Sequence, residues 1–261
     1  MAATNETSDV ARNKGWYQED LTEINEPNAK PTGERERGFA SNPYPCIGLY
    51  RFTILTLHTH PLYEKIVERL KAPGATYLDV GCCFGQELRQ LVLDGLPPEN
   101  LIGIDIAGAL IEHGYELFLD RQLESRFGVI DVFKGPDQPM WAEIEERGVD
   151  VLYCSAFFHL FPLQDQVAAA KLIARLVKKD GVLVGRQIGS TEPSDVAAIQ
   201  VGSSSYRHNV ETLDSMWREV SEGTGTEWKV EGTLDMVGID ITSPVEDKNS
   251  RRLLFTVTRL K

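Results

Sequence analysis

The chain alternates between two spacings of apolar residues. Short β-type runs fall at 77–80, 101–105, 128–132, 149–154 and 181–187. Between these runs, apolar residues recur at helical spacing over 86–94, 107–119, 139–147, 163–178 and 209–221. Two longer β-type runs, 227–237 and 251–260, finish the chain on either side of a polar turn. This order predicts an α/β fold whose seven-stranded sheet is mostly parallel, with one antiparallel strand.

The region before the first β-type run has a different character. Residues 1–14 are polar, which predicts a disordered tail. Residues 15–72 are expected to form a lid followed by a helix, because 15–57 combine Pro, Gly and charge with many aromatic residues, and Pro61 precedes helically spaced apolar residues that end at Gly74. The remaining residues, 73–261, are expected to form one domain.

The most informative segment is the glycine-punctuated turn after the first β-type run. It reads Asp79-Val-Gly-Cys-Cys-Phe-Gly85, and Asp105 closes the next run twenty positions after Gly85. A dinucleotide fingerprint needs a glycine where Cys83 stands, so that the backbone can approach a pyrophosphate. A P-loop needs Lys and Ser or Thr where Gln86-Glu87 follow. The turn therefore favours a nucleoside without phosphates, such as S-adenosylmethionine.

Two acids suit that ligand. Asp79 ends the strand beside the turn, where a carboxylate can hold an amino-acid portion by charge-assisted hydrogen bonds. Asp105 ends the next strand, where a carboxylate can accept both ribose hydroxyls; the alternative is a helix N-cap for 107–119.

The motif resembles the first motif of class I S-adenosylmethionine-dependent methyltransferases, Asp-x-Gly-x-x-x-Gly. The segments Pro43–Gly48, His60-Pro61 and Tyr206–His208 are similar to those of small fungal methyltransferases of terpenoid and polyketide clusters. The resemblance implies a Rossmann-like fold, S-adenosyl-L-methionine as cofactor, methylation of a carboxylate or hydroxyl of a small secondary metabolite, and a homodimer.

The resemblance also implies which residues meet the cofactor. Loop amides come from Gly81, Cys82, Cys83 and Gly85, adenine contacts from Ile106, Asp131 and the Val132 amide, and contacts near the methyl group from Cys154 and Ser155. Tyr17 and Tyr50 of the lid are expected to contact cofactor or acceptor. Asp131 is expected to close the third strand, although it could also be an N-cap or a surface carboxylate.

The predicted catalytic residues follow the fourth and fifth strands. His159, in a segment with Phe157, Phe158 and Phe161, could act as a base for a hydroxyl acceptor or simply pack the loop. Arg207 could clamp a carboxylate, with His208 beside it, or be a surface residue with a capping neighbour. Further candidates in the lid are Arg51, His58 and His60.

The composition of the chain argues against several kinds of partner and cofactor. A net charge of −12 without a basic tract disfavours nucleic acid. The four cysteines and five histidines show no zinc-like spacing, so no metal is expected. Met1–Glu6 lacks the pattern of a signal peptide and no apolar run could span a bilayer, so we expect a cytoplasmic protein.

Methyl transfer to a carboxylate needs no base, whereas a phenol or alcohol benefits from one. We therefore expect a metal-independent O-methyltransferase, with carboxyl methylation ahead of hydroxyl methylation. The alternatives are N- or C-methylation of a small metabolite and a cofactor-binding subunit without catalysis. A nicotinamide-dependent oxidoreductase is a further alternative, against which Cys83 argues.

Overall fold

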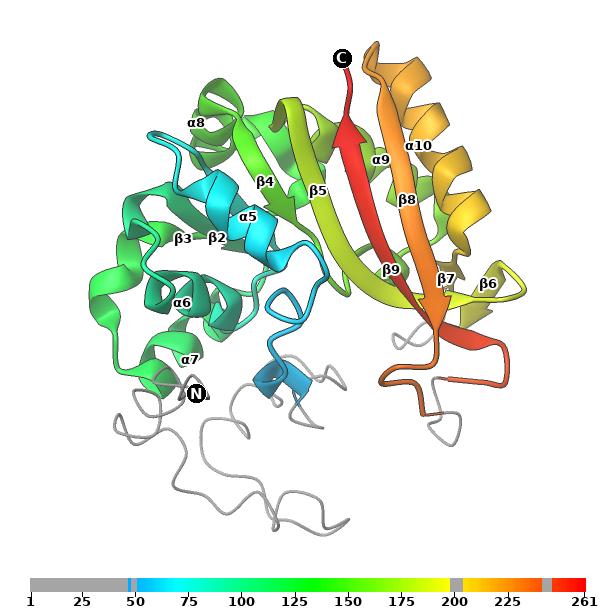
Figure 1. Cartoon of the computed structure of the whole chain (residues 1–261), viewed down its shortest axis with the longest axis horizontal. Coiled ribbons are helices and arrows are strands. Elements are labelled where there is room, and N and C mark those ends of the chain that lie inside the picture. Colours follow the sequence, from blue (N-terminus) through cyan, green and yellow to red (C-terminus); the bar gives the residue numbers. More distant parts are fainter. Residues whose placement is uncertain (1–46, 48–50, 198–203, 241–245) are drawn as a thin grey trace, which may run out of the picture.

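A sheet of seven strands forms the centre of the protein (Figure 1). The computed structural model describes residues 47, 51–197, 204–240 and 246–261. The strands are β1 (Tyr77–Val80), β2 (Leu101–Asp105), β3 (Phe127–Val129), β4 (Val149–Tyr153), β5 (Val177–Ser190), β8 (Trp228–Asp235) and β9 (Ser250–Arg259). Their order is β3-β2-β1-β4-β5-β9-β8. Neighbours from β3 to β5 pair in parallel, and β9 pairs antiparallel with both β5 and β8.

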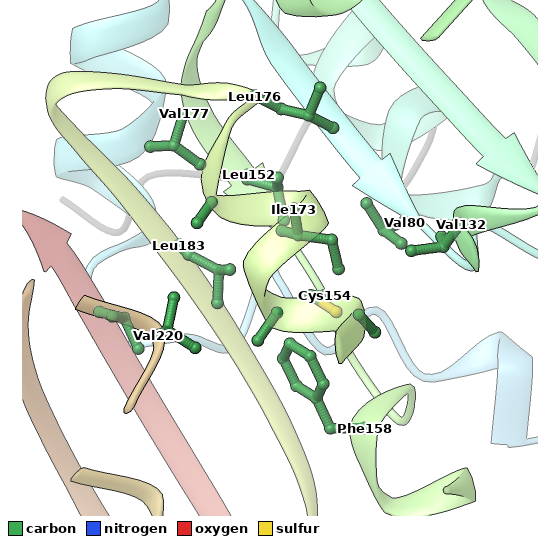
Figure 2. Close-up of a cluster of buried hydrophobic side chains, with 14 of the residues drawn as sticks. Val80, Val132, Leu152, Cys154, Phe158, Ile173, Leu176, Val177, Leu183 and Val220 are labelled. Atoms are coloured by element: carbon green, nitrogen blue, oxygen red, sulfur yellow. The ribbon is translucent and has the colours of Figure 1, made fainter. Parts of the chain in front are cut away.

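Helices cover both faces of the sheet. Buried side chains of α5 (Tyr63–Leu70), α6 (Gln86–Leu93) and α7 (Gly108–Phe118) pack with Tyr77, Tyr153 and Val184 on one face. Those of α8 (Pro139–Arg147), α9 (Leu163–Ala174) and α10 (Val210–Thr224) pack on the other. Figure 2 shows part of this second cluster, with Leu152 and Leu183 of the sheet near Ile173. Because strand side chains alternate between faces, Leu78 and Val80 join the second cluster, while Tyr77 and Asp79 face α5 and α6.

Short 3-10 turns and one hairpin complete the fold. The turns are η1 (Arg51–Thr53), η2 (Pro98–Asn100), η3 (Arg121–Arg126), η4 (Val132–Asp137) and η5 (Phe158–Leu160). The hairpin, β6 (Ser194–Ala197) with β7 (Ser204–Arg207), lies between β5 and α10. α10 begins with a capping box in which Asn209 and Thr212 bond each other's backbone amides. Among the described residues, no helix has the length and apolar character needed to cross a membrane.

The predicted fold class and sheet are confirmed, but some boundaries differ. The third strand ends at Val129, and Asp131 instead caps η4 by accepting a hydrogen bond from the Phe133 amide. The predicted helix 163–178 ends at Ala174, because the buried Val177 already pairs with Val149 of β4. α5 starts at Tyr63, two residues after Pro61.

The β6–β7 hairpin was not predicted. Most of its residues are polar and half or fully exposed, so the pair lacks the apolar alternation that reveals a strand. The predicted tail, and the lid up to residue 50 apart from the helical, buried Ile47, lie outside the described residues.

Candidate cofactor and acceptor site

The glycine turn between β1 and α6 is held to the end of β2 by backbone hydrogen bonds. The amides of Gly81 and Cys82 both donate to the Ile104 carbonyl, at 2.8 and 3.1 Å. Gly81 and Gly85 have φ of +77° and +69°, the left-handed region that glycine adopts without a steric penalty. Cys83 also has a positive φ, 54°, and its amide donates to Asp105 Oδ2 at 2.9 Å. The turn is therefore a closed loop at the carboxyl edge of the sheet.

Tight packing fixes this loop from behind. A Cβ atom added at Gly85 would lie 2.4 Å from the Phe127 ring, and one added at Gly114 of α7 would lie 2.4 Å from the Phe84 carbonyl oxygen. Arg89 of α6 donates to the carbonyls of Phe84 and Gly85, and its guanidinium also makes two bonds of 2.6 and 2.7 Å to Asp120. A buried, bidentate cation thus satisfies the carbonyls of Phe84 and Gly85. The amides of Gly81, Cys82, Cys83 and Gly85 all donate within the protein, so their predicted contacts with a cofactor stay predictions.

Asp105 connects the loop to the start of α7. Its Oδ2 accepts from the Cys83 amide and its Oδ1 from the Ala107 amide at 2.8 Å. Burial raises the pKa of Asp105, and the backbone hydrogen bonds oppose that rise. The carboxylate thus takes part in the capping considered as its alternative role. Each oxygen retains a further lone pair, so a second set of donors such as ribose hydroxyls is compatible with this geometry.

Two buried acids lie next to the loop. Asp79 is 3% exposed, and no group of the described residues donates a hydrogen bond to its carboxylate. Burial, together with the charges of Glu87 and Asp105, raises its pKa well above the usual range. Glu87 of α6 is equally buried, and its Oε2 has no hydrogen-bond partner among the described residues. The site therefore holds two buried acids whose ionised forms a cationic ligand would stabilise.

His159, a predicted acceptor-site residue, lies in η5, the turn after β4. Its Nδ1 accepts a hydrogen bond from the Ile188 amide of β5 at 3.2 Å. Burial and the positive charges of Arg186 and Arg207 lower its pKa to about 3, so the ring is neutral. An accepting Nδ1 in a neutral ring places the proton on Nε2. The ring is thus a hydrogen-bond donor at Nε2, and the predicted role of general base does not agree with this tautomer.

The aromatic segment around His159 borders the loop. Phe157 lies 3.5 Å from where a Cβ of Gly81 would stand, and its ring contacts Phe158 and Phe161 edge-on. Cys154 is buried and its amide donates to the Val184 carbonyl, while Ser155 Oγ donates to the Arg186 carbonyl. Cys154 and Ser155 thus lie at the end of β4, the edge at which the loop lies.

His208 has a structural environment. It has no exposed surface, Nε2 pairs with Gln166 Oε1 at 3.1 Å, and Nδ1 pairs with Thr212 Oγ1 at 3.0 Å. Burial lowers its pKa to about 4. The ring thus joins α9 to α10 and is closed to solvent, and the predicted contact of His208 with an acceptor stays a prediction.

Arg207 is also mostly buried. Its Nη1 donates to Ser250 Oγ at 2.6 Å, and Ser250 in turn donates to Asp247. Burial lowers the pKa of Arg207, opposed by the charges of Asp247 and Glu246. The side chain thus ties β7 to the start of β9, and its predicted role as a carboxylate clamp stays a prediction.

The lid candidates fall at different places. Arg51 pairs with Glu246 at 3.2 Å. His58 is exposed and contacts the Tyr63 ring edge-on, while His60 is buried and accepts from the Leu62 amide at the start of α5. Tyr17 and Tyr50 lie outside the described residues.

Comparison with known proteins agrees with this arrangement. Residues 78–185 match the family model described as a methyltransferase domain. Over 201 residues the chain is 37% identical to the methyltransferase ausD of Penicillium brasilianum, covering 76% of this chain and 71% of that protein. The chain belongs to the class I S-adenosylmethionine-dependent methyltransferases.

Two further comparisons show how much of the chain is similar to known proteins in sequence and in fold. The O-methyltransferase phiE of Fungal sp. (strain ATCC 74256) is 39% identical over 199 residues, covering 75% of this chain and 66% of that protein. The chain thus spans about two thirds of the length of phiE. An S-adenosylmethionine-dependent methyltransferase structure from Clostridium acetobutylicum has a TM-score of 0.50 at 11% identity, covering 97% of this chain and 98% of that one, which supports the fold alone.

The described residues of this methyltransferase fit S-adenosylmethionine. The unmet carboxylate oxygens of Asp79 and Glu87 suit its cationic methionine end, and Asp105 suits the ribose. Ile106, 63% exposed, offers an apolar surface for adenine at the same edge, with Asp131 and the buried Val132 following β3. When bound, this cofactor supplies an electrophilic methyl group on sulfur. The individual residue contacts stay predictions.

Sequence reasoning missed three residues of this methyltransferase site. Glu87 was considered only as a residue that argues against a phosphate site, and Arg89 and Arg186 were not considered. An acid two positions after the last loop glycine was the one available signal for Glu87. The two arginines could not be recognised from the sequence, because the residues they act on come close to them only in the folded chain.

Proposed function

We propose that the protein is a metal-independent O-methyltransferase that transfers a methyl group from S-adenosylmethionine to the carboxylate of a small secondary metabolite of terpenoid or polyketide type. The observation that carries the proposal is the tautomer of His159. Its single lone pair, on Nδ1, accepts the Ile188 amide, so the ring offers a donor and no base. A carboxylate acceptor needs a donor to orient it and is already ionised at neutral pH.

Charge near His159 supports the same acceptor. Arg186 and Arg207 both lie close enough to lower the pKa of His159 by charge. A positive potential attracts an anionic acceptor and holds its oxygen near the donor, which is the contribution of proximity and alignment to a displacement reaction. The apolar rings of Phe157 and Phe161 would exclude water beside it.

The relatives support oxygen as the acceptor atom. phiE is named as an O-methyltransferase, and ausD as a methyltransferase. A hydroxyl acceptor, N- or C-methylation and a non-catalytic subunit remain the competing functions. Formation of S-adenosylhomocysteine with any acceptor separates an enzyme from a subunit.

The chemistry of the product tests the acceptor group. Purified protein is incubated with methyl-labelled S-adenosylmethionine and matched pairs of terpenoid or aromatic acids and the corresponding alcohols or phenols. We expect turnover with the acids and a product that releases labelled methanol in mild base, because esters hydrolyse and ethers do not. A base-stable methylated product would assign the activity to a hydroxyl, nitrogen or carbon instead.

Two substitutions at His159 test the proposed mechanism. In His159→Gln the side-chain amide keeps an N–H donor but has no basic nitrogen, so we expect kcat/KM for the acid to stay within several-fold of wild type. His159→Phe removes the donor, and KM for the acid should rise at least about tenfold, the scale of a lost hydrogen bond to a charged group.

The two mechanisms give opposite results for His159→Gln. A general base contributes about 10²–10⁴-fold, so a loss of that size would show that His159 removes a proton. Because the pKa of His159 is already low, the wild-type kcat/KM profile should show no titration of this ring between about pH 6 and 8. Both variants are compared with wild type for their unfolding midpoint.

A further inference from the structure

Glu87 lies where α6, β1 and the segment before α5 meet, and its two oxygens differ. Oε1 accepts from the Thr56 amide at 2.6 Å, from Thr56 Oγ1 at 3.2 Å and from the Leu57 amide at 3.2 Å. Oε2 is buried and, among the described residues, has no partner. A buried carboxylate oxygen without a donor is costly, so a second ligand for Glu87 is expected on that side.

The surroundings of Oε2 indicate a cation. The Asp79 carboxylate of β1 is also without a donor from the described residues, and the charge of Glu87 is the leading charge effect that raises the pKa of Asp79. The Tyr77 hydroxyl, buried on the same face of β1, is likewise unpartnered in the described part of the chain. The Asp79 carboxylate and Glu87 Oε2, which have no donor from the described residues, favour a ligand with several donors and a positive charge, such as an ammonium.

We propose that Glu87 is a second carboxylate of the cofactor site, whose Oε1 holds residues 56 and 57 on α6 while Oε2, together with Asp79, receives the ammonium group of S-adenosylmethionine. Cofactor binding and the docking of the segment before α5 are thereby coupled through one side chain. The same segment is held at its other end by Arg51 and Glu246, so it bridges α6 and the connection between β8 and β9. The proposal rests on the family's cofactor and is independent of which acceptor is methylated.

Because Glu87 and Asp79 are both buried, cofactor binding should depend on pH. Burial raises the pKa of Glu87 to about 7, while the hydrogen bonds from Leu57 and Thr56 and the charge of Arg186 on β5 oppose the rise. Asp79 of β1 is a second titrating acid, and Tyr77, Tyr63 of α5 and Tyr153 of β4 are phenols near Glu87 with raised pKa values, hence neutral. An ammonium favours the ionised carboxylates, so binding releases protons, and affinity should increase as pH rises from about 6 to 8.

The experiment compares two ligands that differ only in the ammonium. Calorimetry on the full chain measures the binding of S-adenosylhomocysteine and of its deamino analogue, in which hydrogen replaces the ammonium. For Glu87→Gln we expect at least a tenfold loss of affinity for S-adenosylhomocysteine and less than about a twofold change for the analogue. Glu143→Gln, at an exposed position of α8, is the matched control and should change neither.

Equal losses for both ligands, or no loss for either, would show that Glu87 only supports the fold. Circular dichroism and urea unfolding establish that the variant is folded. Should Glu87→Gln fail to fold, wild-type calorimetry at pH 7 in buffers of different ionisation enthalpy decides the question. We expect proton release with S-adenosylhomocysteine and none with the analogue, and equal release with both overturns the proposal. Neither ligand is an acceptor, so failure of the proposed O-methylation would leave this result unchanged.

Discussion

At the scale of single residues, Asp105 combines structural and ligand-binding geometry. It accepts a hydrogen bond from the amide of Cys83, a non-glycine residue of the loop with a positive φ, and it lies at the edge where a ribose is predicted to bind. Asp79, in contrast, has no donor from the described residues. Asp105 thus holds the loop in place before a ligand binds, whereas Asp79 is left to pair with a charge on the ligand.

Asp105→Ala should weaken binding of S-adenosylhomocysteine by at least about tenfold. The change removes a charged acceptor from the ribose and releases the Cys83 and Ala107 amides at once. Asp105→Asn, which keeps one oxygen for these amides, should lose less. Calorimetry measures both affinities, and unchanged affinity in Asp105→Ala would remove this residue from the cofactor site.

Residues whose partners are near in sequence could be predicted, and those with distant partners could not. The glycine loop and Asp105 follow from a local strand–turn–helix pattern. Glu87 bonds Thr56, 31 positions earlier, and His208 bonds Gln166, 42 positions earlier. His208 is polar, which made it resemble a site residue. In the structure its ring is buried, and both ring nitrogens pair with side chains of α9 and α10.

At the scale of elements, α7 packs closely against the glycine loop between β1 and α6, with Gly114 at the point of contact. An alanine there would gain helix propensity of up to about 1 kcal/mol, but its Cβ would stand 2.4 Å from the rigid Phe84 carbonyl oxygen. The steric cost of overpacking, about 1–3 kcal/mol, exceeds that gain. The sequence predicted both elements but could not show how closely they approach.

Gly114→Ala should therefore lower the free energy of unfolding and weaken cofactor binding together, because the displaced element is the loop. The matched control is Gly223→Ala in α10, where the new Cβ meets the flexible end of Lys171. We expect that control to leave cofactor binding unchanged and not to lower the free energy of unfolding. Urea unfolding and calorimetry with S-adenosylhomocysteine test the pair; equal behaviour of the two variants would contradict the argument.

At the scale of the whole molecule, the predicted order of elements gave the sheet correctly, whereas polar strands and strand ends escaped prediction. β3 is shorter than expected because Asp131 is drawn into a cap, and β6 and β7 carry too few apolar residues to be recognised. The residues predicted to meet the cofactor lie mainly at β1, β2 and α6, and those predicted to meet the acceptor lie after β4 and β5. The predicted homodimer stays a prediction.

A ligand that joins β1, β2, α6 and the segment before α5 should stabilise the fold as a unit. S-adenosylhomocysteine at about 100 times its Kd is expected to raise the free energy of unfolding by about 2.7 kcal/mol, because it binds only the native state. NAD at the same concentration should leave it unchanged, since Cys83 occupies the position that a pyrophosphate needs as glycine. Urea unfolding measures both, and stabilisation by NAD alone would argue against the cofactor.

The β6–β7 hairpin is a segment whose two ends lie close together in the fold. Its base is closed by a hydrogen bond of 2.9 Å from the Ser190 amide to the His208 carbonyl, so the chain leaves the sheet and returns at nearly the same point. A segment with adjoining ends can be exchanged without altering the strand order around it. A chimera that carries a relative's hairpin between Ser190 and His208 is therefore expected to keep the seven-stranded sheet and the glycine loop unchanged.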